Sequence, residues 1–136
     1  MSGAKCALLI DCEGHLVTRR GEASADSVDS LAALTAGSFA ATRQMAKLLG
    51  EEHFNTLSHQ GQRESIQISL IGDRTLLAIV WDERTNLGLV RYYAQEASRR
   101  LTDLFVEIRS RPPSAGDAGL ADDYSQQASA ALDDLF

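Results

Sequence analysis

The residues of this sequence that could do chemistry are few and scattered. Cys6 and Cys12 are separated by five residues, without a CxxC motif or a matched pair of histidines. A structural zinc site needs about four ligands in recognisable pairs. Cys6 lies in an apolar run and Cys12 lies beside a predicted turn. We therefore expect both to be small packing residues of a cytosolic protein, with no bound metal.

The other catalytic residue types form no recognisable constellation either. His15, His53 and His59 fall in different segments, and no pair of carboxylates is spaced for acid–base work on a buried face. The nucleophile-elbow, Walker, HExxH and GxGxxG motifs are absent. An exposed arginine could serve as a catalytic finger for a GTPase, and nothing in the sequence selects one among Arg43, Arg63, Arg74, Arg84 and Arg91. The sequence predicts an interaction protein without cofactors rather than an enzyme.

Size and charge narrow the class further. A chain of 136 residues fits one domain with an ordinary core, and 44% hydrophobic and 24% charged residues are typical of a globular protein. All 13 Lys and Arg residues lie in residues 1–111, whereas residues 112–136 carry five acidic residues and no basic one. Because phosphate binding requires a basic surface, we expect no nucleic-acid partner. Apolar runs are far shorter than the ~20 residues of a membrane helix, and we expect neither membrane insertion nor a secretory signal.

The first half of the chain predicts a hairpin and a long helix. Residues 5–11 form a short apolar run, residues 12–14 suit a turn, and a second strand would resume over 15–19, whereas residues 20–27 predict a loop. Asp26 or Ser27 could cap a helix over 28–49, which Gly50 would end. The bulky positions of that helix are Leu31, Leu34, Phe39, Met45, Leu48 and Leu49.

Small residues give this helix an unusual surface. They are Ala32, Ala33, Ala36, Gly37, Ser38, Ala40 and Ala41. One explanation is that alanine is the best helix former. However, an interior glycine costs about 1 kcal/mol relative to alanine, so Gly37 favours a surface on which another element packs closely.

The second half predicts a meander and a second helix. Residues 52–63 are a polar connection, and strands are predicted over 64–71, 74–81 and 87–93. A helix over 94–109 follows, which Pro112 and Pro113 would end. Its apolar face would comprise Ala97, Leu101, Leu104, Phe105 and Ile108. The predicted fold class is α+β, a five-stranded antiparallel sheet with long helices packed on it.

The end of the chain differs from the rest. We divide the sequence into a domain over 1–111, a linker over 112–119 and an acidic amphipathic helix or tail over 120–136. A helix of that length is marginal alone in water. Three outcomes stay open: a disordered tail, a helix on a partner, or a helix on its own domain.

Several segments together resemble the roadblock/dynein-light-chain family. They are ALLID (7–11) with Gly14, LAALTAG (31–37) with AAT (40–42), AKLLG (46–50) with Phe54, and Asp82 with LGLV (87–90) and Ala97. The resemblance covers about residues 5–110, and the LTAG stretch is its most specific part. The tail is also similar to C-terminal helices of bacterial family members.

The resemblance implies a homodimeric regulator of a Ras-like small GTPase of the MglA type, with two protomers per GTPase. Such a regulator stimulates GTP hydrolysis by positioning the GTPase's own catalytic residues, without an arginine finger. It acts in cell polarity and gliding motility, and is cytoplasmic, with a cell pole as one location. Without an effect on hydrolysis, the same dimer would be a scaffold. A small-molecule sensor is a third class, which the bulky apolar central strand disfavours.

The resemblance also implies which residues make contacts. The GTPase would be bound by helix residues Thr35, Ala36, Ser38, Ala40 and Arg43 and by tail residues Tyr124, Leu132, Leu135 and Phe136. The dimer would form through Ala33, Gly37 and Ala41 of the long helix and Ile66 and Ile68 of the third strand. Family members usually begin with an amphipathic helix before the first strand, and this sequence starts almost at that strand. One face of the sheet or one dimer edge would then be less covered.

Overall fold

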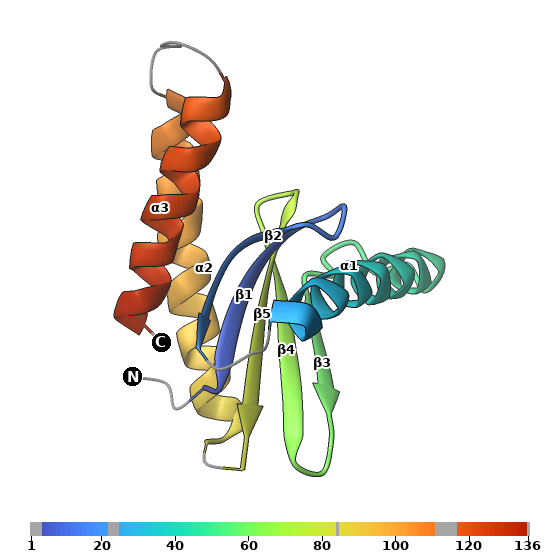
Figure 1. Ribbon diagram of the computed structural model, residues 1–136. Coiled ribbons are helices and arrows are strands. Elements are labelled where there is room, and N and C mark those ends of the chain that lie inside the picture. Colours follow the sequence, from blue (N-terminus) through green and yellow to red (C-terminus); the bar gives the residue numbers. More distant parts are fainter. Residues whose placement is uncertain (1–3, 22–24, 84, 111–116, 136) are drawn as a thin grey trace.

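The computed structural model describes residues 4–21, 25–83, 85–110 and 117–135 (Figure 1). A five-stranded antiparallel sheet has the order β2-β1-β5-β4-β3, so β2 and β3 form its edges. The strands are β1 (Cys6–Asp11), β2 (Leu16–Gly21), β3 (Thr56–Gln60), β4 (Glu64–Ile71) and β5 (Thr75–Asp82). The helices are α1 (Ala25–Leu48), α2 (Leu87–Ser110) and α3 (Asp117–Leu135).

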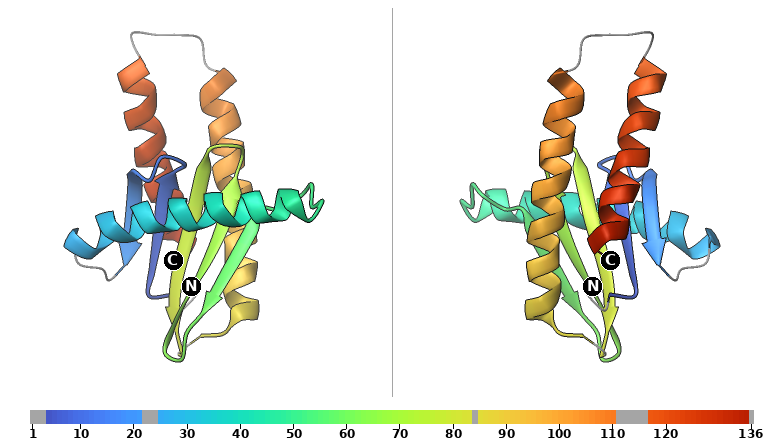
Figure 2. Two further views of the ribbon diagram at one scale, coloured as in Figure 1. Left: turned by 90° about the vertical axis from the view of Figure 1, so that its right-hand side faces the viewer. Right: turned by 90° about the vertical axis from the view of Figure 1, so that its left-hand side faces the viewer.

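The helices cover both faces of the sheet. Figure 2 shows α1 crossing one face of the strands, with α2 and α3 side by side on the opposite face. The central strands β1 and β5 are buried along almost their whole length. Strands that are apolar on both faces need cover on both sides, so the helix–sheet–helix layering follows from their sequence.

Each face of the sheet has its own core. Beneath α1, Leu8, Ile10 and Ile68 pack against Val28 and Phe39 of the helix. On the other face, residues of β1 and β5 pack against both α2 and α3. That second core comprises Ala7, Leu9, Ile71, Leu77, Ile79, Trp81, Val90, Ala94, Ala97, Leu101, Ala128, Leu132 and Leu135.

The structure confirms the predicted hairpin and the end of the long helix. β1 and β2 pair around a turn in which Gly14 has a φ of +95°. At the end of α1, Gly50 has a φ of +80°, and its N–H donates to the carbonyl of Lys47 over 3.1 Å. The N–H of Glu51 donates to the carbonyl of Ala46 over 2.9 Å. This pair of bonds is a Schellman motif, which satisfies the last carbonyls of the helix.

The predicted cap of α1 is wrong, because the helix begins earlier. Its first residue is Ala25, so Asp26 and Ser27 lie within the first turn rather than ahead of it. Acidic residues in a first turn are favourable beside the partial positive charge of the helix N-terminus. The polar residues that indicated a loop therefore also suit a helix start.

The predicted strand over 87–93 is also wrong, because these residues open α2. The aromatic and β-branched residues in that segment favour a strand, but the buried positions Val90, Ala94, Ala97 and Leu101 follow helical spacing. The side chain of Asn86 accepts a hydrogen bond from the N–H of Leu89 over 2.9 Å and so caps the helix. Packing and capping override the local strand propensity.

The fifth strand lies instead within residues 52–63, for which the sequence predicts a polar connection. β3 is an edge strand that pairs only with β4. Its sequence, TLSHQ, is polar because only Leu57 is packed against the core beneath α1. An edge strand lacks the apolar run by which a central strand is recognised.

The C-terminal helix α3 packs on its own domain. Ala128 and Leu132 are fully buried and Leu135 is 7% exposed, within the core that α2 and the sheet share. Arg20 and Arg100 make ion pairs with Asp133 at 2.9 Å and with Asp134 at 2.6 Å, and the Ser125 hydroxyl donates to the carbonyl of Val17 over 3.1 Å. α3 thus lies beside α2 on the face of the sheet opposite α1.

We expect Leu132→Ala to lower the free energy of unfolding by about 2–5 kcal/mol, because it removes a fully buried side chain from the shared core. Chemical denaturation followed by circular dichroism measures this change. Gln126→Ala, at an exposed position of the same helix, is the control and should change stability by less than about 0.5 kcal/mol. Equal effects of the two substitutions would mean that α3 is a detached tail in solution.

Candidate partner-binding site

The long helix α1 carries a second apolar stripe that is largely exposed. We call it the outer face of α1: Leu34, Gly37, Ser38, Ala41, Met45 and Leu48. Its large side chains are strongly exposed, Leu34 at 68%, Met45 at 61% and Leu48 at 88%. The next residue, Leu49, is 80% exposed. Helical spacing aligns these residues, and an exposed apolar patch of this kind marks an interaction surface.

The small residues of α1 divide between its two sides. Ala32 and Ala36 are buried against the sheet, whereas Ala33, Gly37, Ala40 and Ala41 are exposed. A Cβ atom built on Gly37 would meet no other atom within 4 Å. The space beside Gly37 is therefore open, and nothing within the described chain explains a glycine there.

The predicted GTPase contacts on α1 separate in the same way. Ser38, Ala40 and Arg43 are exposed, whereas Thr35 and Ala36 are only 3% and 7% exposed and face the sheet. Exposed Ala40 and Arg43 lie beside a groove of about 240 Å³ whose lining also includes Cys12, Ala36, Phe39, Gln44, Lys47 and Leu76. A neighbouring hollow of about 420 Å³ shares Arg43 and Lys47. Arg43 and Lys47 thus place positive charge at the edge of the groove, and Glu51 and Glu52 also line the neighbouring hollow.

Cys12 lines this groove, and the pKa of its thiol depends on burial and on a nearby charge. Burial raises the pKa of the Cys12 thiol, and the positive charge of Arg43 opposes that rise. Cys12 is nevertheless exposed, whereas Cys6 is buried and its pKa is also raised by burial. Neither cysteine is in a disulfide bond.

The predicted dimer residues fall on two different kinds of surface. Ala33, Gly37 and Ala41 are exposed on α1. Ile66 and Ile68 lie on β4, which is paired on both sides and packs beneath α1. The prediction that 64–71 is the third strand is wrong, because the third strand is β3, so the free edge of the sheet carries residues 56–60 instead.

The predicted contacts of the tail are partly inside the protein. Leu132 and Leu135 are buried in the core, so a partner could reach them only if α3 left the sheet. That role stays a prediction. The side chain of Tyr124 and residue Phe136 lie outside the described residues, as do the side chains of Phe105 and Ile108 and the whole of Arg84.

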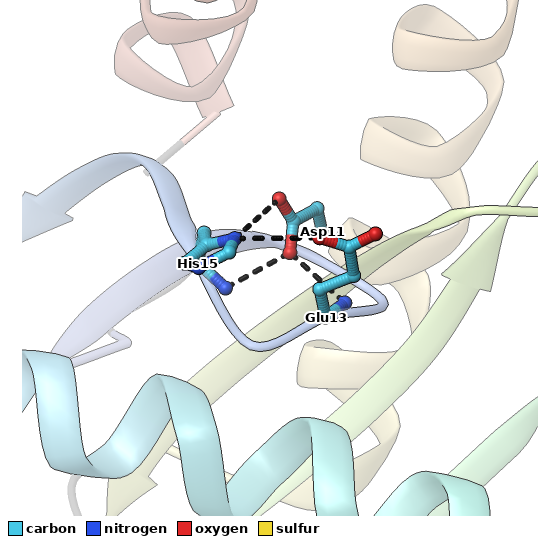
Figure 3. A network of polar contacts seen from close by, with 3 residues as sticks. All are labelled: Asp11, Glu13 and His15. Atoms are coloured by element: carbon cyan, nitrogen blue, oxygen red, sulfur yellow. Dashed lines mark hydrogen bonds and ion pairs between the residues drawn. The ribbon is translucent and has the colours of Figure 1, made fainter.

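Three titratable residues meet at the hairpin turn, where their hydrogen bonds stabilise the turn. Figure 3 shows Asp11, Glu13 and His15 around one carboxylate. Asp11 Oδ1 accepts hydrogen bonds from the N–H groups of Glu13 and His15 over 3.0 and 2.9 Å, and Asp11 Oδ2 lies 3.3 Å from His15 Nδ1. These bonds fix the turn. Across the described residues, no group of three or more His, Cys, Asp or Glu residues could hold a metal ion.

Two features of α1 suit the binding of a partner: its exposed apolar outer face and the groove that Arg43 and Lys47 line. A scan against protein families matches residues 1–80 to the Roadblock/LC7 domain. The chain belongs to the Roadblock/LC7 family. The sheet order and the helices on both faces agree with the α+β roadblock fold expected from the sequence. No curated protein matches the chain.

Solved structures of MglB are similar over most of the chain. Myxococcus xanthus MglB is 39% identical with a TM-score of 0.74, and the alignment covers 78% of this chain and 86% of that chain. The gliding protein MglB from Thermus thermophilus is 38% identical with a TM-score of 0.69, covering 74% and 77%. A structure described as MglB with a tetrameric arrangement is 36% identical with a TM-score of 0.69, covering 74% and 76%.

In the part of this roadblock chain that the structure describes, no helix is both long and apolar enough to cross a bilayer.

Sequence reasoning missed the groove residues Cys12, Gln44 and Lys47. Cys12 comes from the hairpin turn, and only the folded chain brings that turn to α1. The outer face of α1, by contrast, could be expected from the apolar positions of the predicted helix. The predicted helix has more bulky apolar positions than one side of a helix presents, which indicates two packed sides.

The close contact between the hairpin turn and α1 in this roadblock domain gives a stability prediction. A Cβ atom on Gly14 would lie 3.1 Å from Ala33 Cα, and the φ of +95° also disfavours other residues. We expect Gly14→Ala to lower the free energy of unfolding by about 2–3 kcal/mol in chemical denaturation. Gly72→Ala is the matched control, because Gly72 has a φ of +66° with open space around it, and it should cost only about 1 kcal/mol. Equal losses would show that the contact with α1 does not matter.

Proposed function

We propose that this roadblock protein is a homodimeric regulator of a Ras-like small GTPase of the MglA type. It would accelerate GTP hydrolysis by holding the GTPase so that the GTPase's own catalytic residues are positioned, without an active site of its own. The observation that carries this proposal is the exposed apolar outer face of α1 on a chain 36–39% identical to MglB. We further propose that it acts in the cytoplasm at a cell pole, in polarity and gliding motility.

Self-association is supported by the outer face of α1. The face contains no charged residue, and its exposed leucine and methionine side chains would be covered if two copies of α1 packed together. Gly37 lies in its middle, where a side chain would hold the second helix away. β3 is the last strand in the sheet order, so its outer edge presents backbone groups that could pair with a strand of a second copy. A relative whose structure is described as tetrameric supports the same tendency.

The dimer can be tested by placing charges on the outer face. We expect Leu34→Lys combined with Met45→Lys to convert a dimer to a monomer in light scattering after size exclusion, because two apolar contacts become repelling charges. Leu89→Lys is the control, since Leu89 is an exposed apolar residue of α2, 38% exposed. Circular dichroism must show an unchanged fold. A double variant that stays dimeric would place the dimer contact elsewhere.

We propose that the GTPase binds across the α1 surface that includes the groove beside the hairpin turn. Ala40 leaves room there for a partner to approach, and the basic residues Arg43 and Lys47 suit an acidic surface or a phosphate-bearing partner. Neither basic residue makes an ion pair with another of the described side chains. Both cations can therefore contact another molecule, beside the carboxylates of Glu51 and Glu52 in the hollow that they share.

The activity is tested by single-turnover GTP hydrolysis of the MglA-type GTPase from the same genome. We expect the rate to rise with added protein and to saturate near two protomers per GTPase. Ala40→Arg should abolish the rise because a long charged side chain blocks close approach. Ala130→Arg, the same change at an exposed position of α3, should leave it intact. Binding without any change in rate would indicate a scaffold instead.

Substitution of Arg43 can distinguish a residue that only contacts the GTPase from a catalytic arginine finger. An arginine finger contributes about 10³–10⁵ to the hydrolysis rate. We expect Arg43→Ala to reduce the stimulated rate by less than about tenfold, since the proposed role is contact alone. A loss of three orders of magnitude would show that Arg43 is a catalytic finger.

The position of the bound GTPase can be tested by alkylation of cysteine. The GTPase should protect Cys12 from alkylation, with buried Cys6 as the internal control.

A further inference from the structure

A polar pocket lies on the face of the sheet opposite α1, between α2 and the β3–β4 half of the sheet. Its volume is about 530 Å³, within the size range of small-molecule sites. The polar residues that line it and carry the argument are Asn55, Gln67, Ser69, Arg91, Gln95 and Ser98. We call this cavity the polar pocket.

The floor of the polar pocket breaks the apolar pattern of the sheet. In the register, Ala7 pairs with Ile79 and Ile79 pairs with Gln67, so one row of side chains changes from apolar to amide as it passes from β5 to β4. The next row changes in the same way, from Leu77 to Ser69. Gln67 is 2% exposed and Ser69 is 8% exposed. Polar side chains this deeply placed are normally there to make hydrogen bonds.

These floor groups are only partly satisfied by the protein. The Ser58 hydroxyl donates to Gln67 Oε1, which leaves the amide nitrogen of Gln67 for another acceptor. Among the described residues, the structure gives the Ser69 hydroxyl no hydrogen-bond partner. The floor of the pocket therefore offers an unused amide donor and an unused hydroxyl.

The wall opposite the floor comes from α2. Arg91, Gln95 and Ser98 follow one another at helical spacing around Ala94, which is 3% exposed and packs on the sheet. Among the described residues that line the pocket, Arg91 is the one with a charged side chain, and none is acidic. The described side chains give Arg91 no ion pair, in contrast to Arg99 and Arg100 of the same helix. The pocket thus has one uncompensated positive charge among neutral hydrogen-bonding groups.

We propose that the polar pocket binds a small polyhydroxylated monocarboxylate, with Arg91 pairing with the carboxylate and the amides and hydroxyls bonding to its hydroxyl groups. One guanidinium matches one carboxylate in a bidentate pair. Gln67 and Ser69 would bond to the hydroxyls that enter deepest. The part of the lining that the structure describes contains no aromatic side chain and so offers no stacking surface for a nucleobase. This site lies on the opposite face of the sheet from the α1 surface, so the proposal does not rest on the proposed GTPase function.

The probe is D-glucuronate, with D-glucose as the uncharged match and glucose 6-phosphate as the phosphate match. They are titrated into the full-length, ¹⁵N-labelled protein, and amide shifts are followed by NMR. We expect saturable glucuronate shifts along β4 and the start of α2, with a Kd of about 1 mM or tighter. Glucose should bind at least about tenfold more weakly, because it lacks the charge that Arg91 would pair with.

Two variants and a control locate the site. Arg91→Gln and Gln67→Leu should each weaken glucuronate binding by about tenfold or more. Arg99→Gln, on the same helix but paired with Glu96 outside the pocket, should leave binding unchanged. Because Arg91 is exposed, its replacement should leave the fold intact, which circular dichroism checks. The proposal is overturned if glucuronate gives no saturable shift at about 10 mM, if Arg91→Gln binds as tightly as the unmodified protein, or if glucose 6-phosphate binds more tightly than glucuronate.

Discussion

The rest of the structure depends on the burial of the β1–β5 strand pair on both faces. Leu8 of β1 and Leu76 of β5 pack in the core beneath α1, whereas Leu9 and Leu77 pack in the core beneath α2 and α3, and all four are at most 1% exposed. Since neither face can be left to water, helices must lie on each side of the sheet. α1 covers one side alone, whereas the other side needs both α2 and α3. This requirement makes the C-terminal helix part of the core and leaves α1 with its other side free.

That division explains how α1 can have two roles. Its inner side is held by Val28, Phe39 and the sheet residues beneath them, and its position is fixed by the close approach of Gly14 to Ala33. Its outer face is then presented on a rigid support, with Leu34 and Met45 exposed in a defined geometry. A partner that binds there meets a surface whose shape is already set, so little ordering entropy opposes binding.

Much of this fold could be predicted from the sequence, and the failures share one cause. The hairpin, the end of α1 at Gly50 and strand β4 depend on local signals, and all were predicted. Residues 87–93 look like a strand locally but become helix, because Val90 and Ala94 pack on the sheet and Asn86 caps the first turn. The edge strand β3 was missed because its polarity reflects its place in the sheet. For the site, helical spacing indicated a packed surface on α1, but only the fold separates exposed Ala40 from buried Ala36 and brings Cys12 beside them.

The docking of α3 has a consequence for how the protein is made. Val17 and Ser125 are bonded across 108 positions of the chain, and Arg20 and Asp133 across 113. During synthesis the N-terminal hairpin therefore leaves the ribosome long before the helix that covers it exists. Until α3 has emerged, the core that contains Ala7 and Leu9 lacks Ala128, Leu132 and Leu135, and closure of a long loop must precede its completion. Completion of this core therefore waits until α3 has been synthesised, and the apolar surface that α3 covers stays exposed until then.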